Sequence, residues 1–296
     1  MALELKTGNL WQKIVQRTEA ATACGKLHSI ETDFHPLQQD GIEFVVRVAT
    51  NLKRKAKQKQ AQPDFNPFLP PETELTVSDI SPTHLSVLNK FNVVNHHLLI
   101  VTREFEHQEQ LLTLADFEAL WHCLPQYPSL GFYNGGVAAG ASQLHKHLQL
   151  VPLPLYEGSP AYPFEALYSS DAYPEEIRQL PSLPFQHAWR RLPKGLEQDP
   201  AKAAALTWTL YRKMLQSVAI HPIQDSDGEI QSAPYNLLLT KQWMLLVPRS
   251  REYWEKISVN ALGYVGSLFI QDLADLEKLR KYGPMNLLKA VSAAKT

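Results

Sequence analysis

The chain has 296 residues, of which 44% are hydrophobic and 20% charged, and its formal net charge is −1. This length can bury a substantial core in one large or two ordinary domains. The near-neutral charge gives no general attraction to nucleic acid or to acidic membranes. Two cysteines, Cys24 and Cys123, make no disulfide framework, and neither a secretory signal nor a bilayer-length apolar run is found. These features predict a cytoplasmic, enzyme-sized protein that binds neither nucleic acid nor membrane.

The first half of the chain is expected to alternate helices and strands. Apolar residues at helical spacing over 5–15 predict an amphipathic helix, and the β-branched stretch "GIEFVVRVA" (41–49) predicts a strand. A basic run and then "PFLPP" (67–71) indicate an extended loop or linker. The apolar run Leu98–Thr102 predicts a buried strand. A helix should follow, with Thr113 as its N-cap and Asp116 completing a capping box.

The second half begins after a proline-rich stretch between Pro154 and Pro200, which we read as irregular. Residues 202–220 predict a helix, 235–250 a two-strand unit turning at 240–242, and 274–283 a helix stopped by Gly283 and Pro284. The expected division is a catalytic region over 1–165, a connector over 166–200 and a C-terminal region over 201–296. Because "HHLLIVTREF" and "WMLLVPRSRE" share a strand-to-basic-turn pattern, the two halves are expected to be related. The fold class is α+β, with largely antiparallel sheets and flanking helices.

One short stretch, "GASQLHKHLQL" (140–150), places polar residues at every second position. On a strand, His145, His147 and Gln149 point to one face and Lys146 to the other, about 6.5 to 7 Å apart along each row. A polar, solvent-facing side of an amphipathic strand is the simplest explanation. Two histidines and an amide in register behind a glycine-rich loop favour a functional site.

The glycine-rich loop before the histidines has the features of an anion site. Gly135, Gly136 and Gly140 can adopt positive φ and turn several N–H groups toward one oxygen-rich ligand. Ser142 and Gln143 add side-chain donors beside them. A tight hairpin turn is the alternative, although this loop is longer than the simplest hairpin requires.

Three chemistries compete for the histidine stretch. A metal site is weakly indicated, because Gln149 is a poor zinc ligand and no nearby cysteine or carboxylate completes the set. A serine hydrolase would have a G-x-S-x-G turn, and "GASQL" lacks its second glycine. A histidine that attacks phosphorus needs a neutral imidazole whose distal nitrogen is held by a carbonyl. The third chemistry fits best.

These residues resemble the histidine-triad superfamily in its H-x-H-x-Q form, which is that of the transferase branch. The segments "DFNPFLPPE", "KFNVVNHHLLIVTREFEHQ", "FYNGGVAAGASQLHKHLQLVPLP" and "YNLLLTKQWMLLVPRS" together resemble the ATP adenylyltransferase family, also called diadenosine tetraphosphate phosphorylases. The likeness covers nearly the whole chain, and the proline-rich connector is its least distinctive part. It implies a histidine-triad-like sheet and a reversible, two-step adenylyl transfer.

By this resemblance, His147 is the nucleophile on the α-phosphorus of a dinucleoside polyphosphate, and ATP is the leaving group. Phosphate then takes the adenylyl group from His147 and leaves as ADP. Gln149 can donate a hydrogen bond to phosphate but cannot act as a general acid or base, and His145 is a supporting residue of the motif. The implied substrate ligands are Lys55, in a basic run with Lys53 and Arg54, Phe91, Asn92, Asn134, Gly140, Ala141, Ser142, Gln143, Asn236, Lys241 and Arg249.

The expected partners are small nucleotides: diadenosine tetraphosphate, ATP, ADP and phosphate. No protein-held metal or cofactor is indicated, although Mg²⁺ commonly accompanies polyphosphates. Two other functions stay open at this point. One is a hexose-1-phosphate uridylyltransferase, which shares H-x-H-x-Q, and the other is a nucleotide-binding sensor without catalysis.

Overall fold

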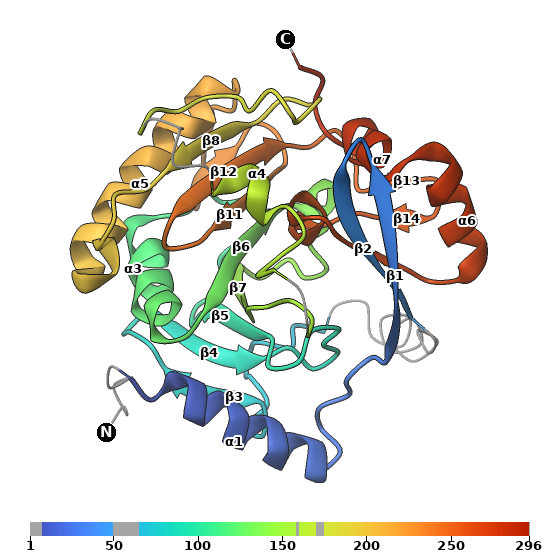
Figure 1. Cartoon of the computed structure of the whole chain (residues 1–296). Coiled ribbons are helices and arrows are strands. Elements are labelled where there is room, and N and C mark those ends of the chain that lie inside the picture. The colour runs from blue at the N-terminus through green and yellow to red at the C-terminus, as the bar shows by residue number, and fades with distance from the viewer. Residues whose placement is uncertain (1–7, 50–64, 158–159, 170–174, 296) are drawn as a thin grey trace.

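The structure, a computed structural model, describes residues 8–49, 65–157, 160–169 and 175–295. Its centre is an eight-stranded sheet in which every neighbouring pair is antiparallel (Figure 1). In sheet order the strands are β3 (Thr76–Asp79), β4 (His84–Leu88), β5 (Leu98–Thr102), β7 (His147–Pro152), β6 (Ser129–Gly135), β11 (Tyr235–Leu239), β12 (Trp243–Pro248) and β8 (Ala188–Arg191).

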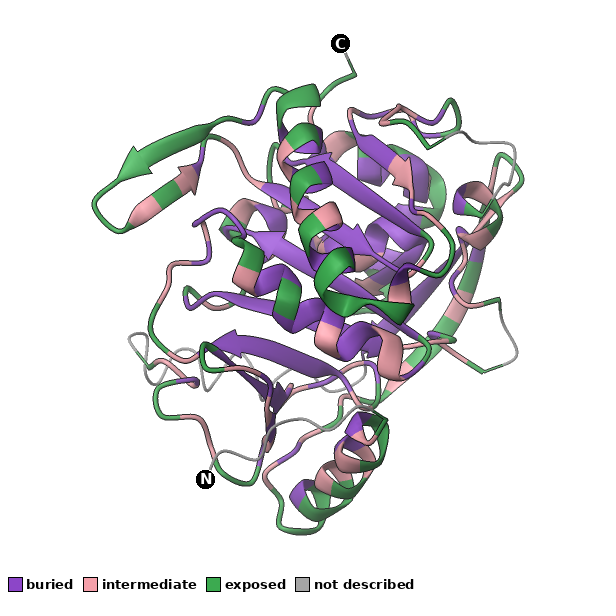
Figure 2. Cartoon of the chain, turned by 90° about the vertical axis from the view of Figure 1, so that its left-hand side faces the viewer, coloured by how far each residue is buried: buried purple, intermediate pink, exposed green. Residues whose placement is uncertain are grey.

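Helices cover one face of this sheet. Helix α3 (Leu114–Cys123) packs against α5 (Pro200–Ser217), and α1 (Leu10–Ala23) lies against β3 and β4. Apolar side chains from these helices join every second residue of the strands, such as Leu237 and Leu239 of β11, in one core. Figure 2 shows the sheet buried beneath helices whose outer sides are exposed, the arrangement that amphipathic helices produce.

The other face of the sheet carries a second core, to which Leu238 of β11 and Phe132 of β6 belong. A three-stranded mixed sheet packs there, formed by β1 (Thr32–Gln39), β2 (Ile42–Ala49) and β15 (Ser267–Ile270), with α6 (Leu273–Tyr282) and α7 (Pro284–Val291) beside it. The remaining elements are short: α4 (Glu165–Tyr168), β9 (Pro222–Asp225), β10 (Gly228–Gln231), β13 (Tyr253–Trp254), β14 (Ile257–Ser258), η1 (Leu124–Gln126), η2 (Val137–Ala139), η3 (Leu196–Gln198) and η4 (Ala261–Val265).

The large sheet has an internal repeat. A strand, a helix and two further strands occur first as β5, α3, β6 and β7 and again as β8, α5, β11 and β12. The order β5-β7-β6 is followed in the sheet by its mirror order, β11-β12-β8. The two units meet where Asn134 of β6 pairs with Asn236 of β11. The chain is thus α+β with two related halves, as expected, and both halves share one sheet.

Several local predictions are confirmed. The strand Leu98–Thr102 has the expected bounds, Thr113 and Asp116 form the capping box of α3, and β11 and β12 flank the turn at 240–242. Two expectations are wrong. Strand β8 lies in the stretch read as irregular, and the repeat matches β12 with β7 instead of β5. Helix α6 ends before Gly283, as predicted, and Pro284 then begins α7. Among the described residues, no helix has the length and apolarity to cross a bilayer.

Candidate active site

Strand β7 separates two chemically different environments. His147 and Gln149 alternate with Lys146 and Leu148, so the histidine side faces the core of β2 and β15 and the lysine side faces α3. Lys146, His147 and Gln149 are all buried. The solvent-facing explanation of the polar row is therefore wrong, and the histidine row lies inside the protein.

The ring of His147 is held in one tautomer. Its Nδ1 lies 2.8 Å from the backbone carbonyl oxygen of His145. A carbonyl can only accept, so Nδ1 must carry the proton, and Nε2 is left with its lone pair. Among the described residues, no side chain or backbone group hydrogen-bonds to this Nε2. His147 thus has the form that attack on an electrophile requires.

His145 is a supporting residue with its own fixed tautomer. Its Nε2 donates to the carbonyl oxygen of Thr102 at 2.8 Å, and its Nδ1 accepts from Nδ2 of Asn66 at 3.0 Å. The ring of Phe68 packs against both histidines, with centroid separations of 5.6 Å to His145 and 5.5 Å to His147. Both ring nitrogens of His145 are therefore used within the protein, which limits His145 to positioning.

Burial controls the charge of both histidines. Burial lowers the pKa of His147 to about 4, against a smaller opposing effect of its bond to the His145 carbonyl. The pKa of His145 is also lowered by burial, opposed by bonds to the backbone of Thr102 and Glu104. His147 is consequently neutral at physiological pH without any partner that removes its proton.

The glycine-rich loop follows β6 and comes close to the second half of the chain. Gly136 and Gly140 both have φ of +90°, a conformation that favours glycine. A β-carbon at Gly140 would lie 3.0 Å from Asn260 and from the carbonyl oxygen of Val259. The loop thus needs glycine both for its backbone conformation and for its contact with residues 259–260.

Three predicted substrate ligands lie behind this loop. Asn134 accepts through Oδ1 from Asn236 and from the N–H of Ala261, at 2.8 and 3.0 Å. Nδ2 of Asn236 also donates to the carbonyl oxygen of Ala139 at 2.9 Å. Arg249 is buried and donates to Asn236 at 2.6 Å and to several backbone carbonyls, Ala139 among them. These three side chains hold the loop in place from within the protein.

The other predicted ligands are spread more widely. Gly140, Ala141, Ser142 and Gln143 form the loop that leads into β7, and Ser142 is exposed. Asn92 is buried and uses its amide within the protein, accepting from Ser29 and donating to the carbonyl of Val94, while Phe91 stacks on His28. The predicted Lys55, together with Lys53 and Arg54, lies outside the described residues.

Lys241 is not brought to the site. It lies in the turn between β11 and β12, beyond Leu239, which pairs with Gly131. The glycine-rich loop leaves β6 at Gly135, which pairs with Tyr235 at the opposite end of β11. Four residues of strand span about 13 Å. A substrate role for Lys241 at the His147 site therefore has no support in the arrangement of the sheet.

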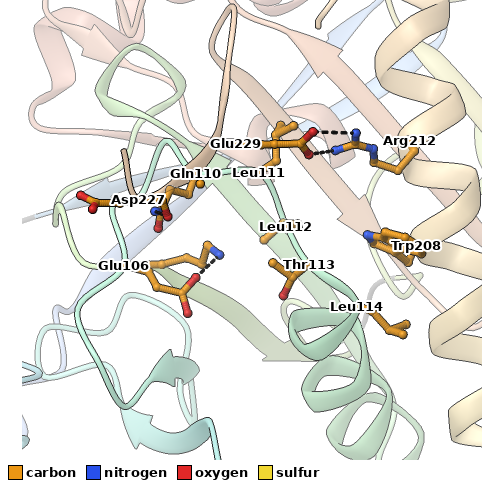
Figure 3. A pocket seen from close by; sticks show the side chains of 12 residues that line it. Glu106, Gln110, Leu111, Leu112, Thr113, Leu114, Trp208, Arg212, Asp227 and Glu229 are labelled. Carbon is orange, nitrogen blue, oxygen red and sulfur yellow. Dashed lines mark hydrogen bonds and ion pairs between the residues drawn. The ribbon is translucent and has the colours of Figure 1, made fainter. Parts of the chain in front are cut away.

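A cavity of about 260 Å³ lies on the lysine side of β7, lined by residues that include Glu106, Lys146 and Trp208 (Figure 3). Lys146 pairs there with Glu106 and with Asp116, which in turn bonds His84. None of the predicted site residues lines this cavity. We assign the chemistry to the histidine side, because the nucleophile and the glycine-rich loop lie there.

Within the part of the chain that the structure describes, no three His, Cys, Asp or Glu side chains gather into a group able to hold a metal ion. The third position of the histidine motif is Gln149, whose amide is a poor metal ligand.

Sequence reasoning missed several side chains that build the site. Asn66 and Phe68 come from "DFNPFLPP", Thr102 ends β5, and Gln108 bonds the backbone of His147. The Asn-Pro pair in the first segment was a signal for an ordered turn. Nothing in the local pattern marked Gln108, whose partners are tens of residues away.

Comparison with known proteins agrees with this geometry. Residues 1–170 match the family model of the Ap4A phosphorylase N-terminal domain, and residues 181–294 match that of the ATP adenylyltransferase C-terminal domain. The chain belongs to the Ap4A phosphorylase family. Ap4A is diadenosine tetraphosphate, so this is the family that the motifs had indicated.

Individual relatives of this Ap4A phosphorylase family member are found in Saccharomyces cerevisiae. The chain is 29% identical to diadenosine 5',5'''-P1,P4-tetraphosphate phosphorylase 2, over 92% of this chain and 90% of that protein. It is 27% identical to Protein APA1, over 88% and 86%. The crystal structure of yeast Ap4A phosphorylase Apa2 in complex with Ap4A is 27% identical, covers 100% of both chains and has a TM-score of 0.79. The complex of Apa2 with AMP has a TM-score of 0.78 at 28% identity and covers 100% of this chain and 99% of that one.

Proposed function

We propose that the protein catalyses the reversible phosphorolysis of diadenosine tetraphosphate, and that His147 carries the adenylyl group between two half-reactions. The observation that supports this is the Nε2 of His147, which has no hydrogen-bond partner among the described residues, while Nδ1 donates to the His145 carbonyl. The Ap4A phosphorylase family to which the chain belongs supplies the substrate class.

In the first half-reaction Nε2 of His147 donates its lone pair to the α-phosphorus, and the bond from phosphorus to the bridging oxygen breaks. ATP leaves with that oxygen. Because Nε2 carries no proton, no base is needed to activate it. The positive charge that develops on the ring is stabilised through Nδ1–H, which donates to the His145 carbonyl at 2.8 Å.

In the second half-reaction an oxygen of inorganic phosphate attacks the same phosphorus and the bond to Nε2 breaks, which releases ADP and restores neutral His147. The backbone of Gln149 pairs within the sheet, but its side-chain amide has no hydrogen bond to another described residue and is available to the adenylyl phosphate. The N–H groups of Gly140 and Ala141 donate within the loop to the carbonyls of Val137 and Gly136, so those of Ser142 and Gln143 would stabilise the negative oxygens. Mg²⁺ would arrive with the polyphosphate substrate.

The test is to incubate the protein with diadenosine tetraphosphate without phosphate and to look for an acid-labile adenylyl adduct by intact-mass spectrometry. The adduct should map to His147, disappear on addition of phosphate with release of ADP, and be absent from H147A. A uridylyl adduct from a uridine diphosphate sugar, with none from the adenylyl donor, would favour the uridylyltransferase alternative. Stoichiometric AMP binding without an adduct would indicate the sensor.

His187 provides a matched control for the adduct. It is buried, its Nδ1 bonds the carbonyl of Phe185 at 2.8 Å, and burial lowers its pKa to about 4, as for His147. Its Nε2 differs, because it accepts from the N–H of Leu180 at 2.7 Å. H187Q should therefore keep the adduct.

A cytoplasmic location, which the two unpaired cysteines are compatible with, is a further proposal that cell fractionation would test.

A further inference from the structure

Gln108 lies between the two strands that form the site. Its side chain is buried, with 1% exposed, and it belongs to the loop between β5 and α3 and not to a strand of the sheet. Its Nε2 donates to the carbonyl oxygens of Asn134 on β6 and His147 on β7, at 2.9 and 3.3 Å. Its Oε1 accepts from the backbone N–H of His147 at 2.9 Å. One amide thus bonds both strands at the residue that carries the nucleophile.

The amide of Gln108 occupies the place of a missing pair in the sheet. Strands β6 and β7 pair from Ser129–Pro152 to Phe132–Gln149. Continuing this register by two residues would place Asn134 opposite His147, and their backbone groups would bond directly. Those groups bond Gln108 instead. The side chain therefore separates the strands where β6 passes into the glycine-rich loop and β7 begins at His147.

The backbone of Gln108 is fixed to the same region. Its N–H donates to the carbonyl of Leu144 at 2.7 Å, and its own carbonyl accepts from the hydroxyl of the buried Tyr133 on β6. A side chain anchored at both ends and buried throughout has little freedom to move. Its amide can consequently act as a rigid spacer between the strands.

We propose that Gln108 is a positioning residue for the nucleophile: it fixes the backbone of His147 and holds β6 and β7 apart so that Nε2 of His147 meets a phosphorus bound at the glycine-rich loop. This inference rests on the proposed function. The hydrogen bond that orients the ring of His147 goes to the carbonyl of His145, two residues earlier on the same backbone. A displacement of that backbone therefore also displaces Nε2. A misplacement of about 1 Å at a reacting atom can cost about 100-fold in rate.

The test compares Q108M, which keeps the length of the side chain without its donors and acceptor, with Q108N, which keeps the amide on a side chain shorter by one methylene. The matched control is Q126M. Gln126 also bridges backbone groups with its amide, accepting from Leu10 and donating to His122, but it lies in η1. The melting temperature, the rate of adduct formation on His147 in a single turnover, and KM and kcat are measured for each variant.

We expect kcat and the rate of adduct formation to fall by about 100-fold in Q108M and by at least about tenfold in Q108N, with KM changed less than about threefold. Q126M should keep the wild-type rate even where its melting temperature falls as far as that of Q108M. Adduct formation within twofold of wild type in either Gln108 variant, or an equal loss in Q126M, would overturn the proposal. The two failures are distinguishable. No adduct in the wild-type protein contradicts the proposed function and with it the role of Gln108, whereas an adduct that forms equally fast in wild type and in the Gln108 variants contradicts the role of Gln108 alone. If Q108M does not fold, Q108N decides by the same criterion.

Discussion

The guanidinium of Arg249 lies 2.6 Å from Oδ1 of Asn236, and both side chains donate to the carbonyl oxygen of Ala139 in the glycine-rich loop. Two residues of the C-terminal half thus hold a loop of the N-terminal half. Burial lowers the pKa of Arg249 from its usual value, opposed mainly by the nearby Tyr264. Arg249 donates to neutral groups, namely backbone carbonyls and Asn236. Its positive charge can therefore attract an anion bound at the glycine-rich loop.

Replacing Arg249 should loosen the glycine-rich loop. In R249M the buried carbonyl of Val259 loses its donor, which costs about 1 to 3 kcal/mol. The carbonyl of Ala139 loses one of its two donors and keeps the bond from Asn236. We expect lower stability in urea and at least about a tenfold fall in kcat/KM for diadenosine tetraphosphate. R249K should recover part of the binding, because it keeps the charge but not the fork of donors. Wild-type kcat/KM in R249M would contradict a role in holding the loop.

Gly140 should tolerate no side chain. In G140A the residue keeps a φ of +90°, and the new β-carbon meets Asn260 and Val259 at 3.0 Å. Strain and overpacking together should cost about 2 to 4 kcal/mol and weaken AMP binding. The control is G195A, where φ is +77° but the nearest atom to the new β-carbon is 3.6 Å away. It should lose about 1 kcal/mol and keep AMP binding. Equal AMP affinity in both variants would count against the loop as the phosphate site.

The pH dependence of adduct formation should report the buried state of His147. Burial lowers its pKa to about 4, and only the neutral ring attacks. His147 should therefore stay neutral from pH 8 down to about 5, and over this range its titration should not change the rate of adduct formation. The rate should fall as pH approaches 4. The first half-reaction must be measured alone, since inorganic phosphate titrates in the same range. A midpoint near 6.5, the usual histidine value, would show that His147 is solvated in the working enzyme.

The buried ion network on the lysine side of β7 should contribute to stability over a defined pH range. Burial raises the pKa of Asp116, but the hydrogen bond from His84 and the charge of Lys146 outweigh it and hold the pKa at about 2. This pKa is below that of the unfolded chain, so the stabilisation is present above about pH 4 and is lost as pH falls toward 2. D116N should lose about 3 kcal/mol of unfolding free energy at pH 7.

The difference in unfolding free energy between wild type and D116N should shrink as pH falls from 4 to 2, as urea denaturation at each pH would show. The control variant is E106Q. Glu106 is partly exposed where it pairs with Lys146, so its loss should cost less than about 1 kcal/mol. A pH-independent difference between wild type and D116N would mean that the carboxylate charge of Asp116 is not what stabilises the fold.

The sequence by itself determined the features that depend on neighbours along the chain. The alternation of His145, His147 and Gln149 follows from the two-residue period of a strand, and the capping box of Thr113 and Asp116 from one turn of helix. Positive φ was expected at Gly135, Gly136 and Gly140. Gly136 and Gly140 adopt it, whereas Gly135 ends β6 and pairs with Tyr235. The motif order was also sufficient to indicate the family.

Only the tertiary structure decided which side chains meet across the sheet. Asn134 pairs with Asn236 because β6 and β11 join the two halves of the chain in one register, and that register also carries Lys241 to the far end of β11. Gln108 reaches His147 from a loop 39 residues earlier. Long-range strand pairing fixes these contacts, and periodicity along a single segment contains no information about the partner strand.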